Sequence, residues 1–408
     1  MTVRILLCAI AVAIAVYAFT SGIMALAHRD SGYFDIGFTA EGNAVLYQSG
    51  LHLRYYAEGS SNEIRRLTNQ VQKLYTTLAL EAYKLLDERA VYEGLNSIAS
   101  INAAPNSWVS VPESLYAVLE SANQLQSEHY SLFSGALHAQ WETLRYLEDP
   151  AEFDPANDGD KQALLARHAQ WLRTPGTFSL DFDKDNTAVR LNVSDAYLSW
   201  AQENGIDAPV LDLNALHDAY LMKAVAQSLR AQGYNDGYLY TDSGLYVYLS
   251  GAGQGISFTV NAYDGEKEIA VAALNASSPL SLVRFTAYAP EGTQYGYYAV
   301  EKGGKPLYRH LYPDIAGGEY CDQLMTLYLA AGENDIVDIA LRCAEWNGLK
   351  TSEEIAASAA KLPESTFAAY TLQDGSKTLY VREGSAVKGI TLDPESGFAV
   401  QGIELLTN

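Results

Sequence analysis

The chain has 408 residues, a formal net charge of −22 and 19% charged residues. This length is enough for a large hydrophobic core. The negative charge excludes nucleic acid or an anionic membrane surface as the main partner, because both are polyanions. It does not exclude an anionic small ligand, since a local site or a metal ion can reverse the local field.

The first 30 residues are expected to form a signal peptide or an N-terminal membrane anchor. Residues 5–27 carry no charge and are long enough to span a bilayer. The run ends in Ala25-Leu26-Ala27, which also fits a signal-cleavage site. Its length favours the anchor. In either alternative, residues 31–408 form an extracytoplasmic functional domain. This domain is secreted if the segment is cleaved; if the segment is kept, it anchors the domain to the membrane.

Helix-type and strand-type patterns alternate in the remaining chain without a regular βαβ rhythm, which predicts an α+β fold of mixed sheets and packed helices. In chain order the patterns predict an edge strand (51–57), a helix (63–87), a turn-forming stretch (89–105), helices (111–126 and 161–172), a hairpin (178–183 and 188–193), strands (257–261, 269–273, 284–289 and 295–301), a strand or helix (323–331), helices (335–347 and 352–362) and strands (366–372, 378–382 and 389–392).

Residues 211–253 carry the clearest local signals. Asn214 suits the N-cap of a helix, and Gly233 suits its left-handed C-cap. The apolar positions between them recur at helical spacing, at Leu216, Tyr220, Val225 and Leu229. A tyrosine-rich hairpin turned at residues 241–244 is predicted to follow. A helix N-terminus presents free N–H groups, so this segment can hold a phosphate; a buried helix without a ligand is the alternative.

Five separated segments occur in an order and spacing that resemble one family, the FAD:protein FMN transferases or ApbE-type flavin transferases. The segments are SIASINAAPNSWVSVPESLYAVLESA, which resembles S-E-L-S-x-L-N and its helix; YSLFSGAL with Trp141, which resembles F-D-P-T-V-G-P-L and its tryptophan; LDLNALHDAY, which resembles I-D-L-G-G-I-A-K-G-Y; RHLYPDIAGG, which resembles H-I-I-D-P-R-T-G; and VDIALRCAEWNG, which resembles A-D-A-L-A-T-A-L-F-V-L-G. The resemblance covers about residues 50–385.

The resemblance implies an ApbE-type fold and a phosphoryl-transfer reaction. Such enzymes move FMN from FAD to a threonine or serine hydroxyl of a target protein and release AMP. The implied partners are FAD, a divalent metal such as Mg²⁺ on the pyrophosphate, and a membrane redox protein as flavin acceptor.

The same resemblance implies roles for single residues. His310 matches the motif histidine near the reacting phosphate, and is the implied catalytic residue. The implied cofactor-binding positions are Asp212, Asp218, Ser131 and Tyr220, and the implied metal positions are the Ala215 carbonyl, Asp338 and Arg342. Each also has a structural alternative: a carboxylate that caps or faces a helix N-terminus, or a histidine that only packs.

Several positions depart from the family pattern. Asp218 replaces a lysine, which reverses the charge near the expected phosphates. Asn214 and Ala215 replace two glycines, Ser131 replaces an aspartate, Pro313-Asp314 inverts an Asp-Pro pair, and Ile315 and Ala316 replace a basic residue and a threonine. Arg342 replaces a hydroxyl metal ligand and is predicted to pair with Asp338 one helical turn away. Its guanidinium would then stand where the metal should be.

Three hypotheses of function follow. The first is a working or weakened FMN transferase, and the second is a non-catalytic flavin- or nucleotide-binding relative. The third is an exported adhesion or sugar-binding module that uses the tyrosine-rich strands, of which the 29 tyrosines are the only sign.

The exported part contains only Cys321 and Cys343. Spacing leaves open whether they pair or remain separate buried thiols. Both segments border the active site that the resemblance implies, and we therefore predict that the two are close enough to bridge.

Overall fold

The computed structural model describes residues 30–250, 256–276, 279–290 and 296–403. Its largest sheet has nine strands in the order β1-β2-β6-β7-β10-β13-β14-β15-β17. Neighbours are antiparallel except β15 and β17, which are parallel. The strands are β1 (Asp30–Ile36), β2 (Leu51–Gly59), β6 (Gly237–Thr241), β7 (Leu245–Ser250), β10 (Leu280–Thr286), β13 (Leu324–Gly332), β14 (Phe367–Leu372), β15 (Thr378–Arg382) and β17 (Ala399–Gly402).

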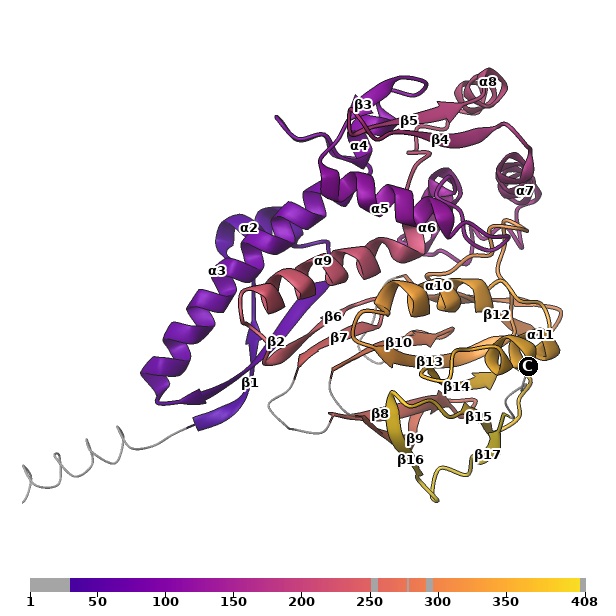
Figure 1. Ribbon diagram of the computed structural model, residues 1–408. Coiled ribbons are helices and arrows are strands. Elements are labelled where there is room, and N and C mark those ends of the chain that lie inside the picture. The colour runs from indigo at the N-terminus through magenta and orange to yellow at the C-terminus, as the bar shows by residue number, and fades with distance from the viewer. Residues whose placement is uncertain (1–29, 251–255, 277–278, 291–295, 404–408) are drawn as a thin grey trace, which may run out of the picture.

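Three helices cover one face of this sheet: α3 (Ser61–Leu86), α9 (His217–Ala231) and α10 (Ile336–Trp346) (Figure 1). Each buries a row of side chains spaced by three or four residues, as an amphipathic helix does. In α3 the row includes Val71, Tyr75 and Ala79, and in α9 it includes Leu221, Val225 and Leu229, all fully buried. Two further short helices are α2 (Ala40–Leu46) and α11 (Ser352–Ala360).

A three-stranded sheet packs against the other face, in the order β16 (Val387–Leu392), β9 (Glu268–Ala276), β8 (Ile256–Tyr263). Tyr328 and Phe367 of the large sheet share a core with Val260 and Leu274 of the small one. This second core is separate from the helix-covered core. Figure 1 shows β8, β9 and β16 on the side of the large sheet opposite its helices.

A second small sheet is formed by β3 (Trp108–Ser110), β5 (Ala188–Val193) and β4 (Phe178–Asp183), in that order. Together with the helices around it, this sheet lies near the N-terminal end of α9 (Figure 1). The chain around it forms α4 (Ile98–Asn102), α5 (Glu113–Gln124), α6 (Gly135–Arg145), α7 (Gly159–Arg173), α8 (Asp195–Glu203) and the 3₁₀ turn η1 (Asn214–Leu216). A hairpin of β11 (Tyr298–Lys302) and β12 (Lys305–Arg309) completes the described part.

The predicted α+β class is confirmed, and so are the hairpin turn at residues 241–244 and the left-handed Gly233, whose φ is 83°. Residues 51–57 are not an edge strand, because β1 pairs with β2 on its outer side. Asn214 is not the N-cap of α9: it opens η1 with φ of 48°, and α9 begins at His217.

The ambiguous residues 323–331 belong to strand β13, and the turn-forming stretch 89–105 contains the helix α4. The predicted anchor or signal segment lies outside the described residues except for its last position. In the described ranges, none of the helices is both long and apolar enough to cross a bilayer.

Candidate functional site

The segment before α9 is fixed by a small polar network. The Asp212 carboxylate accepts the backbone N–H of Asn214 at 2.7 Å, and Asn214 Nδ2 donates to Ser134 Oγ at 2.9 Å and to the Ser131 carbonyl at 3.3 Å. Asparagine tolerates the positive φ that this turn needs. Gly135 allows the close approach, since a Cβ there would lie 2.5 Å from the Pro209 carbonyl oxygen. The fold thus brings together the predicted site residues Asp212 and Ser131.

A charged cluster surrounds His217 at the start of α9. Its Nδ1 lies 3.3 Å from the Asp218 carboxylate, whose other oxygen accepts from Ser243 Oγ at 2.5 Å. Burial alone would lower the pKa of His217, but the hydrogen bond and charge of Asp218, with Glu88 and Asp212, raise it to about 9. Burial, together with the charge of Glu88, raises the pKa of Asp212 to about 7.

Tyr220 lies one turn further along α9 and is almost fully buried. Its hydroxyl donates to Ser121 Oγ at 3.1 Å. Burial raises the pKa of this phenol. The Tyr220 hydroxyl therefore contacts a residue of α5. Ser131 Oγ also has a partner within the protein, since it donates to Gln126 Oε1 at 3.2 Å.

Arg342 pairs with Asp338 on α10, as the sequence predicts. Arg342 Nε lies 2.9 Å from one carboxylate oxygen, and Nη2 lies 3.4 Å from the other. The helix that carries them packs against η1, which contains Ala215. The predicted metal positions therefore belong to adjacent elements, but the carboxylate already faces a cation.

We tested whether these residues suit Mg²⁺, which prefers six oxygen ligands in octahedral geometry. Both oxygens of Asp338 face the guanidinium of Arg342. Within the described ranges, no three His, Cys, Asp or Glu side chains are grouped to hold a metal ion. The residues present do not fit Mg²⁺.

His310 is buried, with 1% of its surface exposed. Burial and the charges of Arg145 and Arg309 hold the pKa of His310 well below its usual range, so the ring is neutral. Its Nδ1 accepts the backbone N–H of Tyr312 at 3.2 Å, which leaves the proton on Nε2. The ring packs edge-on against Phe285 and Tyr320. Among the described residues, none of the hydrogen bonds of the Asp212 network reaches His310.

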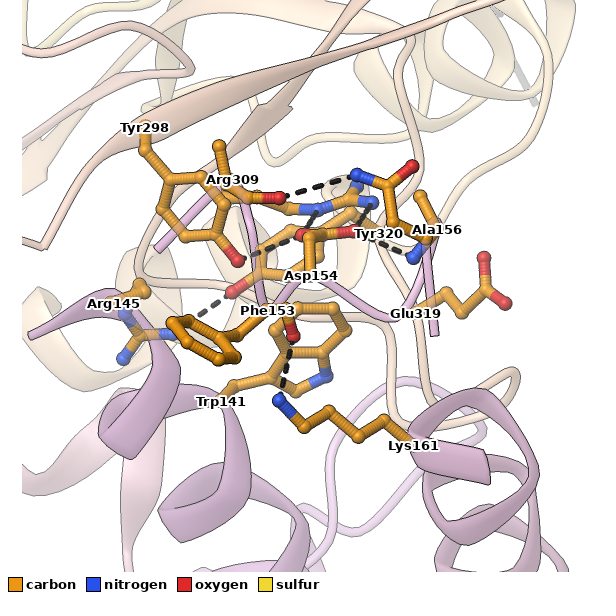
Figure 2. Close-up of polar contacts among 12 residues, drawn as sticks. Trp141, Arg145, Phe153, Asp154, Ala156, Lys161, Tyr298, Arg309, Glu319 and Tyr320 are labelled. Carbon is orange, nitrogen blue, oxygen red and sulfur yellow. Dashed lines mark hydrogen bonds and ion pairs between the residues drawn. The ribbon is translucent and has the colours of Figure 1, made fainter. Parts of the chain in front are cut away.

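A buried ion pair lies next to His310 (Figure 2). Arg309 donates to both carboxylate oxygens of Asp154 at 2.8 and 3.0 Å, and the Tyr298 hydroxyl donates to the same carboxylate at 2.8 Å. The guanidinium also lies over the rings of Trp141 and Tyr320. Nothing in the sequence pattern singles out this pair, because Asp154 belongs to a loop that reads only as rich in proline and aspartate.

A cavity of about 400 Å³ opens beside Ser131. Its walls come from the end of α5, the segment that follows it, the loop after α7, strand β4 and residues 315–316. Apolar and hydroxyl or amide side chains both line it; among them are Phe133, Phe178, Leu180, Gln126, Ser131 and Ser179. This volume and mixed lining are typical of small-molecule sites. Ser131 and Phe133 lie in the segment YSLFSGAL and residues 315–316 lie in RHLYPDIAGG, whereas the walls from the end of α7, the loop after it and β4 lie outside the motifs.

A second cavity of about 10 Å³, room for about one water molecule, lies next to η1. Ser131 and Ile315 line both, and the smaller one reaches Ala215. Its wall also includes His129, whose Nδ1 lies 3.1 Å from the buried carboxylate of Asp314.

The hydrogen bond that His129 donates to the Asp314 carboxylate raises the pKa of His129. The same carboxylate accepts the N–H groups of Ala316 and Gly317 at 3.1 and 3.0 Å, so this pair shapes the loop at the cavity. The inverted Pro313-Asp314 order thus supplies a structural carboxylate.

Cys321 and Cys343 are both free thiols and form no disulfide here. That the two are close enough to bridge stays a prediction. Cys321 Sγ donates to the Gly348 carbonyl, and Cys343 is fully buried in α10 beside Asn347. Each thiol is held by its own neighbours rather than by the other.

The tyrosine-rich strands stack their rings on one another. Tyr238 and Tyr248 have centroids 4.9 Å apart with planes at 22°, and Tyr240 and Tyr246 lie 6.0 Å apart at 16°. These ring faces are turned to each other, whereas sugar binding needs exposed faces. The arrangement favours packing within the sheet over a sugar-binding surface.

The nine-stranded sheet, its covering helices and the small sheet above α9 define the fold of the ApbE flavin transferases. The structure is similar to the ApbE protein from Thermotoga maritima, with a TM-score of 0.54 and 14% identity over 90% of this chain and 98% of that chain. It is also similar to the flavin transferase ApbE from Vibrio cholerae, with a TM-score of 0.50 and 9% identity over the same shares.

The predicted resemblance is thereby confirmed for the fold alone. Sequence identities this low carry no information on activity. No family model and no curated protein matches the sequence.

Proposed function

We propose that this protein is a non-catalytic flavin-binding relative of the ApbE flavin transferases, which takes its ligand into the 400 Å³ cavity beside Ser131. The observation that carries the proposal is the Asp338–Arg342 ion pair, in which a guanidinium engages the carboxylate that was expected to bind the metal. A guanidinium supplies permanent positive charge but cannot replace a divalent ion on a pyrophosphate. We also propose that residues 31–408 are located outside the cytoplasm.

Two other implied site residues, His310 and Asp218, support the same proposal. His310 is buried, neutral and engaged with the Tyr312 N–H. Asp218 is engaged with His217 and Ser243. The cavity, by contrast, has unfilled volume and aromatic walls from Phe133 and Phe178. The architecture therefore favours binding over phosphoryl transfer.

One observation favours a second candidate, the FMN transferase itself. The pKa of Asp212, raised to about 7, is near the value at which a carboxylate works best as a general base. In such a reaction Asp212 would take the proton of an acceptor threonine or serine hydroxyl. That oxygen would bond to the FMN phosphorus as the bond to AMP breaks. The acceptor would be a membrane redox protein.

The two candidates are separated by one experiment on the full-length chain. It is incubated with riboflavin, FMN or FAD, with and without Mg²⁺, and both bound flavin and released AMP are measured. We expect flavin binding that Mg²⁺ does not change, and no AMP. AMP release with a matching flavin-labelled protein would establish the transferase instead, and failure of every flavin to bind would overturn both.

A cavity-filling variant places the ligand. Ser179→Trp puts a large side chain at the exposed edge of the cavity, and we expect it to abolish most flavin binding. Ser257→Trp, at an exposed position of β8 in the other small sheet, is the matched control and should bind flavin normally.

A further inference from the structure

We infer that the flavin this site accepts is one without a diphosphate, of the riboflavin class, and that FAD is disfavoured. The inference rests on the proposed function and specifies its ligand. It departs from what the family resemblance implies, because it follows from charges that the resemblance does not predict.

Carboxylates occupy the helix terminus where a phosphate was predicted. Asp218 lies in the first turn of α9, and Asp212 lies just before η1. Glu88 is close enough to both Asp212 and His217 to influence their titration. The helix N-terminus and His217 attract an anion, but these acidic groups already neutralise them. A diphosphate placed here would add like charge at short range.

The nearby cations are already engaged by protein groups. Arg89 lies 2.6 Å from Glu142 and 3.2 Å from Glu88. Arg342 faces Asp338. Arg173 is the only basic residue among the described residues that line the large cavity; it donates to the Ala316 carbonyl, and Glu128 lines the same cavity. The site therefore offers no cation pair of the kind that binds a diphosphate bidentately.

The polar groups that remain suit a neutral ligand. Ser127 and Ser131 line the large cavity. A serine hydroxyl can both donate and accept a hydrogen bond, so it suits the ribityl hydroxyls of a flavin. Gln126 and Ser179 supply side-chain donors and acceptors for the pyrimidine edge of a flavin ring.

The size of the cavity agrees with this ligand. A volume of about 400 Å³ lies near the lower end of the range for small-molecule sites. It suits a three-ring heterocycle with a short polyol chain, held between apolar walls that include Phe133 and Phe178. The larger FAD molecule would have to extend beyond this cavity.

The test compares affinities of the full-length chain for riboflavin, FMN and FAD at one ionic strength, from quenching of flavin fluorescence. We expect riboflavin to bind about tenfold more tightly than FAD, a ratio that falls as salt screens the repulsion. The variant Asp218→Lys should raise FAD affinity by a similar factor and leave riboflavin affinity unchanged. Glu266→Gln, in the exposed β8–β9 turn, is the charge-change control and should alter neither.

The outcomes separate the inference from the proposed function. If FAD binds as tightly as riboflavin or more tightly, the inference is overturned and the flavin-binding function stands. An Asp218→Lys variant with unchanged FAD affinity would also overturn it, since the charge would then have no influence. If no flavin binds at all, the proposed function falls and the inference falls with it.

Discussion

Arg309 and Asp154 form a bidentate ion pair in which the two side chains are 5% and 0% exposed. The pair joins the loop between α6 and α7 to the last residue of β12, directly before His310. Burial alone would raise the pKa of Asp154, but Arg309, the Ala156 N–H and the Tyr298 hydroxyl together hold it below its ordinary value. The position of the His310 loop therefore depends on a charge pair that the family motifs do not include.

Removing one partner of this pair should be strongly destabilising. We expect Arg309→Met to lower the free energy of unfolding by about 3–5 kcal/mol, because it leaves the Asp154 carboxylate buried without its counter-ion. The double variant with Asp154→Leu should recover much of that loss. Urea denaturation measures both. The exposed Arg190–Asp181 pair is the control, and Arg190→Met should cost less than about 1 kcal/mol. Equal losses at the two arginines would contradict the prediction.

Local sequence patterns predict some parts of this structure and miss others. Hydrophobic periodicity predicted α3, α9 and α10, because each of these helices buries a continuous row of side chains. The i,i+4 spacing of Asp338 and Arg342 predicted their pairing, since partners one helical turn apart need no tertiary information.

The wrong predictions depend on contacts between distant segments. Residues 51–57 looked like an edge strand because nothing in the sequence shows that β1 adds itself outside them. Asn214 looked like a helix cap, whereas its amide bonds to Ser131 and Ser134, about eighty residues away. The cavity is assembled from separated segments, and no motif contains its walls from the end of α7, the loop after it and β4, although Ser131, Phe133 and residues 315–316 lie in two motifs.

The His217 cluster predicts a loss of stability in alkaline solution. The pKa of His217 rises from 6.5 to about 9 on folding, so the folded state binds the proton more tightly. The resulting stabilisation is complete below pH 6.5 and is lost as the pH rises through about 9. Urea midpoints measured across this window should fall for the native chain and fall less for His217→Asn. A native chain with constant stability over the window would contradict the prediction.

The Asp338–Arg342 pair predicts how metal binding could be gained. We expect the native chain to show no heat of Mg²⁺ binding in titration calorimetry, since Arg342 faces both oxygens of Asp338. The variant Arg342→Thr with Asp218→Lys removes that cation and restores a positive charge near the expected phosphates. It should bind FAD in a Mg²⁺-dependent manner. Arg65→Thr, at an exposed position of α3, is the control for loss of an arginine. A double variant that ignores Mg²⁺ would count against the account of the lost metal site.

The free state of Cys321 and Cys343 can be tested by alkylation without reductant. Burial raises the pKa of each thiol to about 12, so neither is a reactive thiolate at neutral pH. Cys321 is half-buried and should label slowly in the folded protein, whereas Cys343 is fully buried and should label only after denaturation. Peptide mass spectrometry distinguishes the two sites, and Cys321→Ser should remove the slow phase alone. A cross-linked Cys321–Cys343 peptide would show that the thiols can meet, and would contradict the free state of both.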